Sequence, residues 1–137
     1  NLSMSWNVLF HDDFYTEFQA MGGVLQDELL AHARLLQEFG PHLGRPTVDT
    51  LKGSKHSNMK ELRFDYAGGV WRVAFAFDTA RAAILLVSGD KGGADQRRFY
   101  KNLITSADAR FDEHLATLKA ASISKQVKEK NHGKKSK

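Results

Sequence analysis

The chain has 137 residues, 42% of them hydrophobic, which is enough apolar material for one domain with its own core. No apolar run approaches the roughly 20 residues of a membrane span, and no basic segment followed by an apolar block begins the chain, so neither a membrane protein nor a signal peptide is indicated. The absence of Cys excludes a disulfide scaffold and thiolate chemistry, and a soluble cytoplasmic protein is expected. The formal net charge is +4.

The first third of the chain predicts one strand and two helices. Residues 1–5 are expected to be an N-terminal extension or a non-native remnant, and the apolar run 6–10 (WNVLF) is typical of a strand. Asp12 or Asp13 can cap the short helix that follows, because a carboxylate accepts the free N–H groups of a first turn. Apolar residues then recur every three or four positions over 24–39, which predicts a second helix.

The middle of the chain predicts a loop and three strands. Residues 41–58 contain two Pro, two Gly and mainly polar side chains, so they are predicted to be a loop. Strands are predicted at 59–66, 70–77 and 82–88, joined by short connections suited to hairpins. The last strand is apolar on both faces, as expected for a central strand that is covered on both sides.

The last third predicts a long helix and a basic tail. The helix begins at Asp95, and its apolar stripe has a period near 3.6 residues. Residues 122–137 are rich in Lys, which predicts either a mobile basic tail or a frayed extension of the helix. The order β-α-α-β-β-β-α therefore predicts an α+β domain over residues 6–121, with helices packed on a small, mainly antiparallel sheet.

The strand predicted at 70–77 has two unlike faces, because successive side chains of a strand alternate in direction. The apolar face consists of Trp71, Val73, Phe75 and Phe77. Arg72 projects from the other face, where its small neighbours Ala74 and Ala76 leave room for water or a ligand. On the preceding strand, the side chains predicted to face outward are those of Glu61, Arg63 and Asp65.

Positive charge is unevenly distributed along the chain. The formal net charge is −5 over residues 1–44, +5 over 45–101, −1 over 102–121 and +5 over 122–137. The basic middle segment suggests a polyanionic partner. Alternatively, the acidic first third packs beside it and neutralises it.

Neither the His residues nor the Gly-rich segment forms an established ligand-binding motif. The six His never occur as an HxH or HxxxH pair and have no Cys partner, so no metal site is predicted. The segment GDKGG (89–93) lacks the spacing of a P-loop, but its backbone N–H groups lie between a strand and a helix and can favour a single phosphate. No cofactor is expected.

The basic segment carries the residue types that cleave RNA without a metal. A base must take the proton of the ribose 2′-hydroxyl, cations must stabilise the charge that grows on the phosphorane, and an acid must protonate the leaving 5′-oxygen. Arg, Lys, Tyr and His can share these roles. The alternative interpretation is a solvated charged face with an ordinary surface Tyr.

Four segments together, MKELRF, GVWRVAFAFD, AILLVSGDK and RRFYKNLI, resemble the HigB/RelE-type toxins of bacterial type II toxin–antitoxin systems. The likeness is closest to the phage-derived HigB-like subgroup and extends over about residues 10–119. It implies a RelE-like fold and ribosome-dependent cleavage of mRNA. It also implies neutralisation by a cognate antitoxin, often a helix-turn-helix protein.

The resemblance also implies roles for individual residues. Arg72 would stabilise the reacting phosphate, and Lys91 would have a related role at that phosphate. Tyr100 would take part in proton transfer or base stacking. The general base stays open between Glu61, His56 and Tyr100, and Glu61 is alternatively an ion-pair partner of a neighbouring Arg. The expected substrate-binding residues are Lys60, Arg63, Arg97, Arg98 and Lys101.

Two other functions remain compatible with the sequence. The first is a ParE-like inhibitor of the same fold that binds a protein target such as gyrase without catalysis. The second is a basic nucleic-acid-binding module, for which the middle segment and the basic tail suffice.

Overall fold

The computed structural model describes residues 5–93 and 95–135, and it describes side chains as far as residue 130. Most of the expected extension at 1–5 and the last two residues of the expected tail lie outside the described residues. Within these ranges, no helix has the length and apolarity needed to cross a bilayer. The elements in chain order are β1 (Asn7–Phe10), α1 (Asp12–Gln19), α2 (Gly23–Phe39), the 3-10 turn η2 (Gly40–His42), β2 (Val48–Thr50), β3 (Met59–Tyr66), β4 (Gly69–Phe77), β5 (Ala82–Asp90) and α3 (Gln96–Lys135).

The strands form one mixed sheet in the order β1-β5-β4-β3-β2, which confirms the predicted α+β class. β1 runs parallel to β5, and the other neighbours are antiparallel. The prediction that 41–58 is only a loop was wrong, since this segment contains the end of η2 and the edge strand β2. β2 has only three residues, which pair with Lys60–Leu62 of β3, so its own sequence carries almost no alternating pattern.

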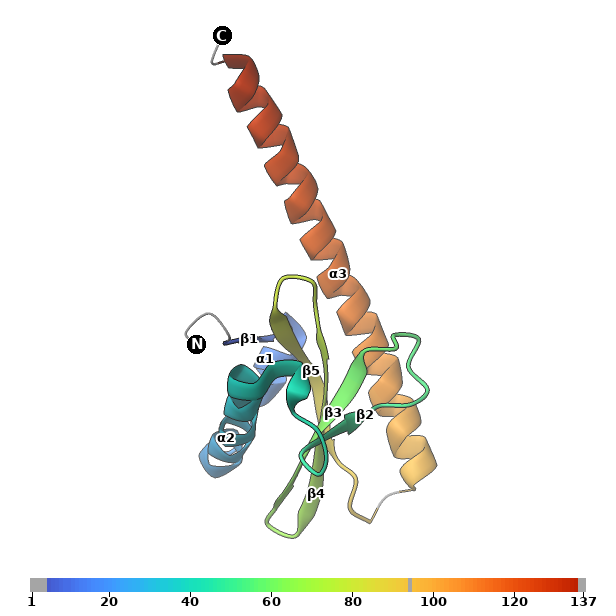
Figure 1. Ribbon diagram of the computed structural model, residues 1–137. Helices are drawn as coiled ribbons and strands as arrows, with labels where there is room; N and C mark the ends of the chain where they lie inside the picture. The colour runs from blue at the N-terminus through green and yellow to red at the C-terminus, as the bar shows by residue number, and fades with distance from the viewer. Residues whose placement is uncertain (1–4, 94, 136–137) are drawn as a thin grey trace.

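Helices α1 and α2 cover one face of the sheet (Figure 1). Leu29 and Leu36 of α2 are fully buried in one cluster with Leu62 of β3 and with Val73 of the predicted apolar face of β4. The cap of α1 differs from the prediction, because the N-cap residue is His11, whose imidazole accepts the N–H of Asp13. Asp12 and Asp13 occupy the first turn instead, where their charges favour the positive end of the helix dipole.

Helix α3 covers the opposite face of the sheet (Figure 1). Its predicted stripe is confirmed, since Leu103, Ala107 and Phe111 are buried against Met59, Ala74, Ala76 and Ile84. This second layer corrects one prediction. Glu61 does not face outward but is buried under α3. Arg72 is also buried, and it lines a cleft beside Arg63.

The C-terminal segment is a continuation of α3 and not a separate coil. The carboxylate of Asp95 accepts the N–H groups of Arg97 and Arg98, so it begins the helix as a cap. The helix then runs to Lys135 without interruption. Of the two expectations for the basic tail, the helical extension therefore describes it as far as Lys135.

Candidate active site

Arg72 lies on the face of the sheet that α3 covers, beside Tyr100 near the start of that helix. It lies in the middle of β4, and its side chain is only 6% exposed. Nη1 donates a hydrogen bond to the carbonyl of Trp71 at 2.9 Å, but Nε has no hydrogen-bond partner among the described residues. The nearest carboxylate oxygen, Oε1 of Glu61, lies 3.6 Å from Nε, within ion-pair range but beyond a good hydrogen bond. The guanidinium is therefore buried with unused donor capacity.

Glu61 and Tyr100 complete this buried cluster. Glu61 projects from β3 toward α3, and Tyr100 projects from the second turn of α3 toward the sheet. The hydroxyl of Tyr100 donates to Oε1 of Glu61 at 2.8 Å. Burial, followed by the hydrogen bond to this carboxylate, raises the pKa of Tyr100 above its usual value. One oxygen of Glu61 therefore faces both a guanidinium and a phenol that stays protonated at neutral pH.

Lys91 reaches the same cluster from the end of β5. Its backbone N–H donates to the carbonyl of Val70 at 2.8 Å, and its ammonium lies 5.7 Å from the centre of the Tyr100 ring, within cation–π range. Asp90 holds the connection in place, since its carboxylate accepts the N–H groups of Gly92 and Val70 at 2.9 Å. These two hydrogen bonds lower the pKa of Asp90.

Glycine at position 89 determines how closely α3 approaches this connection. A Cβ at Gly89 would lie 2.8 Å from the ring of Phe99, nearer than packing allows. The missing side chain lets the first turn of α3 rest on β5, which brings Tyr100 over the sheet. Gly89 also pairs with Arg72 across the β4–β5 ladder, so the contact between α3 and Gly89 lies next to Arg72 in the sheet.

Two clefts open beside the cluster. One cleft, of about 420 Å³, lies between the cluster and the edge strand β2. Its lining residues are Arg45, Asp49, Thr50, Leu51, Lys52, Glu61, Lys91, Gln96 and Tyr100. The second, of about 640 Å³, follows the first turns of α3 and is lined by Gly53, Gln96, Arg97, Tyr100, Lys101, Ile104, Thr105 and Asp108. Tyr100 and Gln96 belong to both, so the two clefts adjoin at the phenol.

Arg63 lies on the other side of Arg72. The two residues are directly paired across the β3–β4 ladder, as the predicted hairpin requires, and both line a cleft of about 370 Å³. Nη1 of Arg63 lies 3.9 Å from a carboxylate oxygen of Asp49, and Nε of Arg45 lies 3.2 Å from the same oxygen. The hydrogen bond from Arg45 is the main reason that the pKa of Asp49 is lowered.

The remaining predicted site residues are divided between this region and others. Arg97 and Lys101 line the larger cleft, and Arg98 lies exposed in the first turn of α3. Lys60 lies on the opposite side of β3 from Glu61, because strand side chains alternate. His56 contacts Asp112 at 2.8 Å and the ring of Phe111, three turns along α3 from Tyr100 and roughly 18 Å away by helical rise. Lys60 and His56 therefore do not join the cluster.

Three residues of the cleft were missed as site residues by sequence reasoning: Arg45, Asp49 and Lys52. All three lie in or beside β2, the strand that the sequence did not reveal. The run 47–51 does contain the β-branched residues Thr47, Val48 and Thr50, which is a weak strand signal. A strand predicted there would have brought these side chains to the edge of β3.

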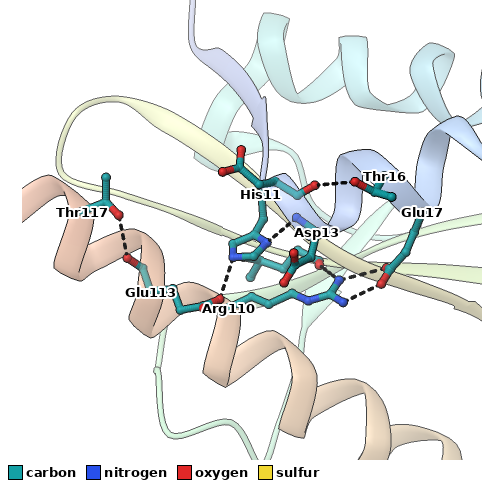
Figure 2. Close-up of polar contacts among 9 residues, drawn as sticks. His11, Asp13, Thr16, Glu17, Arg110, Glu113 and Thr117 are labelled. Atoms are coloured by element: carbon teal, nitrogen blue, oxygen red, sulfur yellow. Dashed lines mark hydrogen bonds and ion pairs between the residues drawn. The ribbon is translucent and has the colours of Figure 1, made fainter.

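A second polar cluster joins α3 to the start of the domain (Figure 2). Nε2 of His11 lies 2.8 Å from Glu113, and Arg110 donates to Glu17 at 2.9 Å. Within the described ranges, His11, Asp13 and Glu113 form one group whose ligand atoms lie within 4.8 Å of one another, as a metal site would require. The hydrogen bonds to Asp13 and Glu113 already use both nitrogens of His11, so this cluster is sufficiently explained as a helix cap and an inter-helix contact.

The chain is similar to phage-derived and toxin proteins. The family described as "Phage derived protein Gp49-like (DUF891)" matches residues 16–112. A Mycobacterium tuberculosis protein named "Putative toxin HigB2" is 48% identical over 89 residues, which are 64% of this chain and 44% of that protein. A second protein from the same organism, named "Putative toxin HigB3", is 52% identical over 83 residues, 61% of this chain and 70% of that protein.

The fold is shared with a solved toxin structure. A mutant of the Escherichia coli toxin RelE in the free state superposes with a TM-score of 0.54 over 78% of this chain and 98% of RelE, at 12% sequence identity. This likeness shows the predicted RelE-like fold. The chain spans less than half of the length of HigB2, at 44%.

Proposed function

This chain belongs to the phage-derived Gp49-like family, and on that premise we propose that it is the toxin of a toxin–antitoxin system and an endonuclease that cleaves mRNA on the ribosome. The toxin names of the two relatives and the RelE-like fold support the first part. The observation that carries the second part is the cluster in which one oxygen of Glu61 faces both Tyr100 and Arg72, beside Lys91. It joins a proton acceptor, a proton donor and two cations.

The proposed reaction needs no metal, and its protons balance within the cluster. Glu61 takes the proton of the ribose 2′-hydroxyl as the 2′-oxygen bonds to phosphorus. Tyr100 gives its proton to the 5′-oxygen as the bond from phosphorus to that oxygen breaks, and the phenol is then restored by the proton that Glu61 received, across their 2.8 Å hydrogen bond. The products are a 2′,3′-cyclic phosphate and a 5′-hydroxyl.

Arg72 and Lys91 would stabilise the phosphorane, whose charge is greatest at the transition state. Arg72 is buried in the free protein, so a phosphate must replace Glu61 as its partner. The unsatisfied Nε of Arg72 makes this exchange favourable, because a buried donor without an acceptor costs about 1–3 kcal/mol. Arg63, Arg97 and Lys101 line the adjoining clefts and would hold the flanking phosphates.

A toxin needs a partner that keeps it silent, and we include a cognate antitoxin, of the helix-turn-helix type, in the proposal. An acidic or helical segment laid over the cleft between Lys91 and Arg45 would exclude RNA. The site of action would be the cytoplasm, where ribosomes translate mRNA.

The proposal is tested by mapping the 5′ ends of mRNA that has been cut on purified translating ribosomes. The ends of the products are then analysed for the expected 2′,3′-cyclic phosphate and 5′-hydroxyl. Tyr100→Phe and Lys91→Gln should each reduce cleavage at least 100-fold. Arg34→Ala, which removes an exposed charge on α2 across the sheet, is the matched control and should cleave normally. Undiminished cleavage by a Tyr100→Phe, Lys91→Gln double variant would sink the proposal. Inhibition of gyrase supercoiling without RNA cleavage would instead establish the ParE-like alternative.

A further inference from the structure

The second half of α3 projects away from the domain as a single helix (Figure 1). Every side chain from Lys119 to Lys130 is exposed, whereas Leu103, Ala107 and Phe111 earlier in the same helix are buried. We call residues 119–130 the arm. The family match ends at residue 112, so the arm lies outside the part of the chain that the family shares.

The arm carries an excess of positive charge on two opposite sides. Its charged residues are Lys119, Lys125, Lys128, Lys130 and Glu129. At about 100° per residue, Lys119 and Lys130 lie on one side of the helix, and Lys125 and Lys128 lie roughly opposite. The arm is about 17 Å long, a distance over which duplex nucleic acid presents on the order of ten phosphate charges.

This arrangement fits a nucleic acid better than a protein. A partner helix would need a longer stripe of large apolar side chains, whereas the apolar side of the arm consists of Ala120, Ile123 and Val127, of which only the last two are large and each of those is 51% exposed. Four lysines against one glutamate, a net charge of +3, instead suit phosphates that contact the helix from two opposite sides. Lys is a flexible point charge without planar geometry, which favours backbone contact without sequence readout.

We propose that the arm is an RNA-binding element that grips the phosphate backbone of structured RNA and anchors the protein on the RNA surface of the ribosome. The ribosomal location rests on the proposed function, whereas RNA binding by the arm does not. The arm then supplies affinity, and the cluster around Arg72 supplies chemistry.

The test uses the full chain and a synthetic RNA hairpin, with binding followed by fluorescence anisotropy between 50 and 200 mM KCl. The variant replaces four lysines by Gln, which has a similar helix propensity: Lys119→Gln, Lys125→Gln, Lys128→Gln and Lys130→Gln. Four phosphate contacts would make the wild-type affinity fall roughly 100-fold over this salt range. The variant should lose most of that salt dependence and bind at least 10-fold more weakly at 50 mM, with unchanged helix content by circular dichroism.

The matched control is Ile123→Ala with Val127→Ala, which should bind the hairpin as the wild type does. Equal affinity and equal salt dependence of the Lys variant and the wild type would overturn the proposal, as would loss of binding in the apolar control alone. On ribosomes the Lys variant should raise KM and leave kcat unchanged. If neither the wild type nor the variants cleave mRNA but the hairpin results are as expected, the proposed function is refuted and the proposal that the arm binds RNA is retained.

Discussion

Replacing Glu61 by Ala is expected to destabilise the fold by about 3–5 kcal/mol, which is the cost of leaving a buried charge without its partner. The side chains of Arg72 and Glu61 are 6% and 9% exposed, so solvation of the guanidinium would offset only a small part of the loss of the carboxylate. The guanidinium would keep the carbonyl of Trp71 as an acceptor but would lose its nearest carboxylate. Such a loss is a large part of the roughly 5–15 kcal/mol that stabilises a domain of this size.

The assay is urea unfolding at pH 7, with the midpoint and slope compared between variants. The matched control is Asp49→Ala, which removes a carboxylate that pairs with the exposed Arg45 and should therefore have a much smaller effect. The double variant Glu61→Leu, Arg72→Met removes both charges and should recover most of the lost stability. A cost below about 1 kcal/mol for Glu61→Ala would refute the reasoning, because it would mean that solvent reaches the guanidinium.

Three further results are expected. Tyr100→Phe should reduce cleavage about 10²- to 10⁴-fold in a single-turnover assay but cost only about 0.5–1.5 kcal/mol in urea unfolding, since it removes one hydrogen bond. Gly89→Ala should destabilise by about 1–3 kcal/mol in thermal unfolding because its Cβ meets Phe99, whereas Gly44→Ala, with nothing within 4 Å of the added Cβ, should not. Hydrogen bonds from Lys55 and then His56 lower the pKa of Asp112 in the folded protein. The carboxylate therefore contributes to the free energy of unfolding above its unfolded pKa of about 3.9, and this contribution is lost as the pH falls through the lower folded pKa. Asp112→Asn should accordingly weaken the loss of stability at acid pH when urea unfolding is measured against pH.

The sequence predicted elements where one residue pattern determines the outcome. The alternation along β4 placed Arg72 and Ala74 on the face opposite Trp71 and Val73, and the two hydrophobic clusters confirm it. Pattern alone does not say what covers a face. Glu61 was therefore expected in solvent, although α3 packs over it and converts an outward position into a buried ion pair.

Long-range placement of loop residues was also beyond the sequence. His56 lies only four residues before Lys60, yet its loop is held to α3 by Asp112, far from Arg72. The edge strand β2 is too short to show a period, so Arg45 and Asp49 went unassigned. In both cases the position depends on a partner more than 10 residues away, which composition and spacing do not encode.

The pairing of β1 with β5 has a consequence for synthesis of the chain. Asn7 pairs with Ala82, so the first strand has no neighbour until the last strand has been made. Tyr100 and the helical layer over Arg72 follow later still. Because a chain grows from its N-terminus and such non-local pairings form slowly, the cluster around Arg72 is assembled only after the segment that contains Tyr100 has been made. Under the proposed function, a nascent chain would thus be inactive toward the ribosome that is making it, and the time before α3 docks would be an interval in which the proposed antitoxin can bind first.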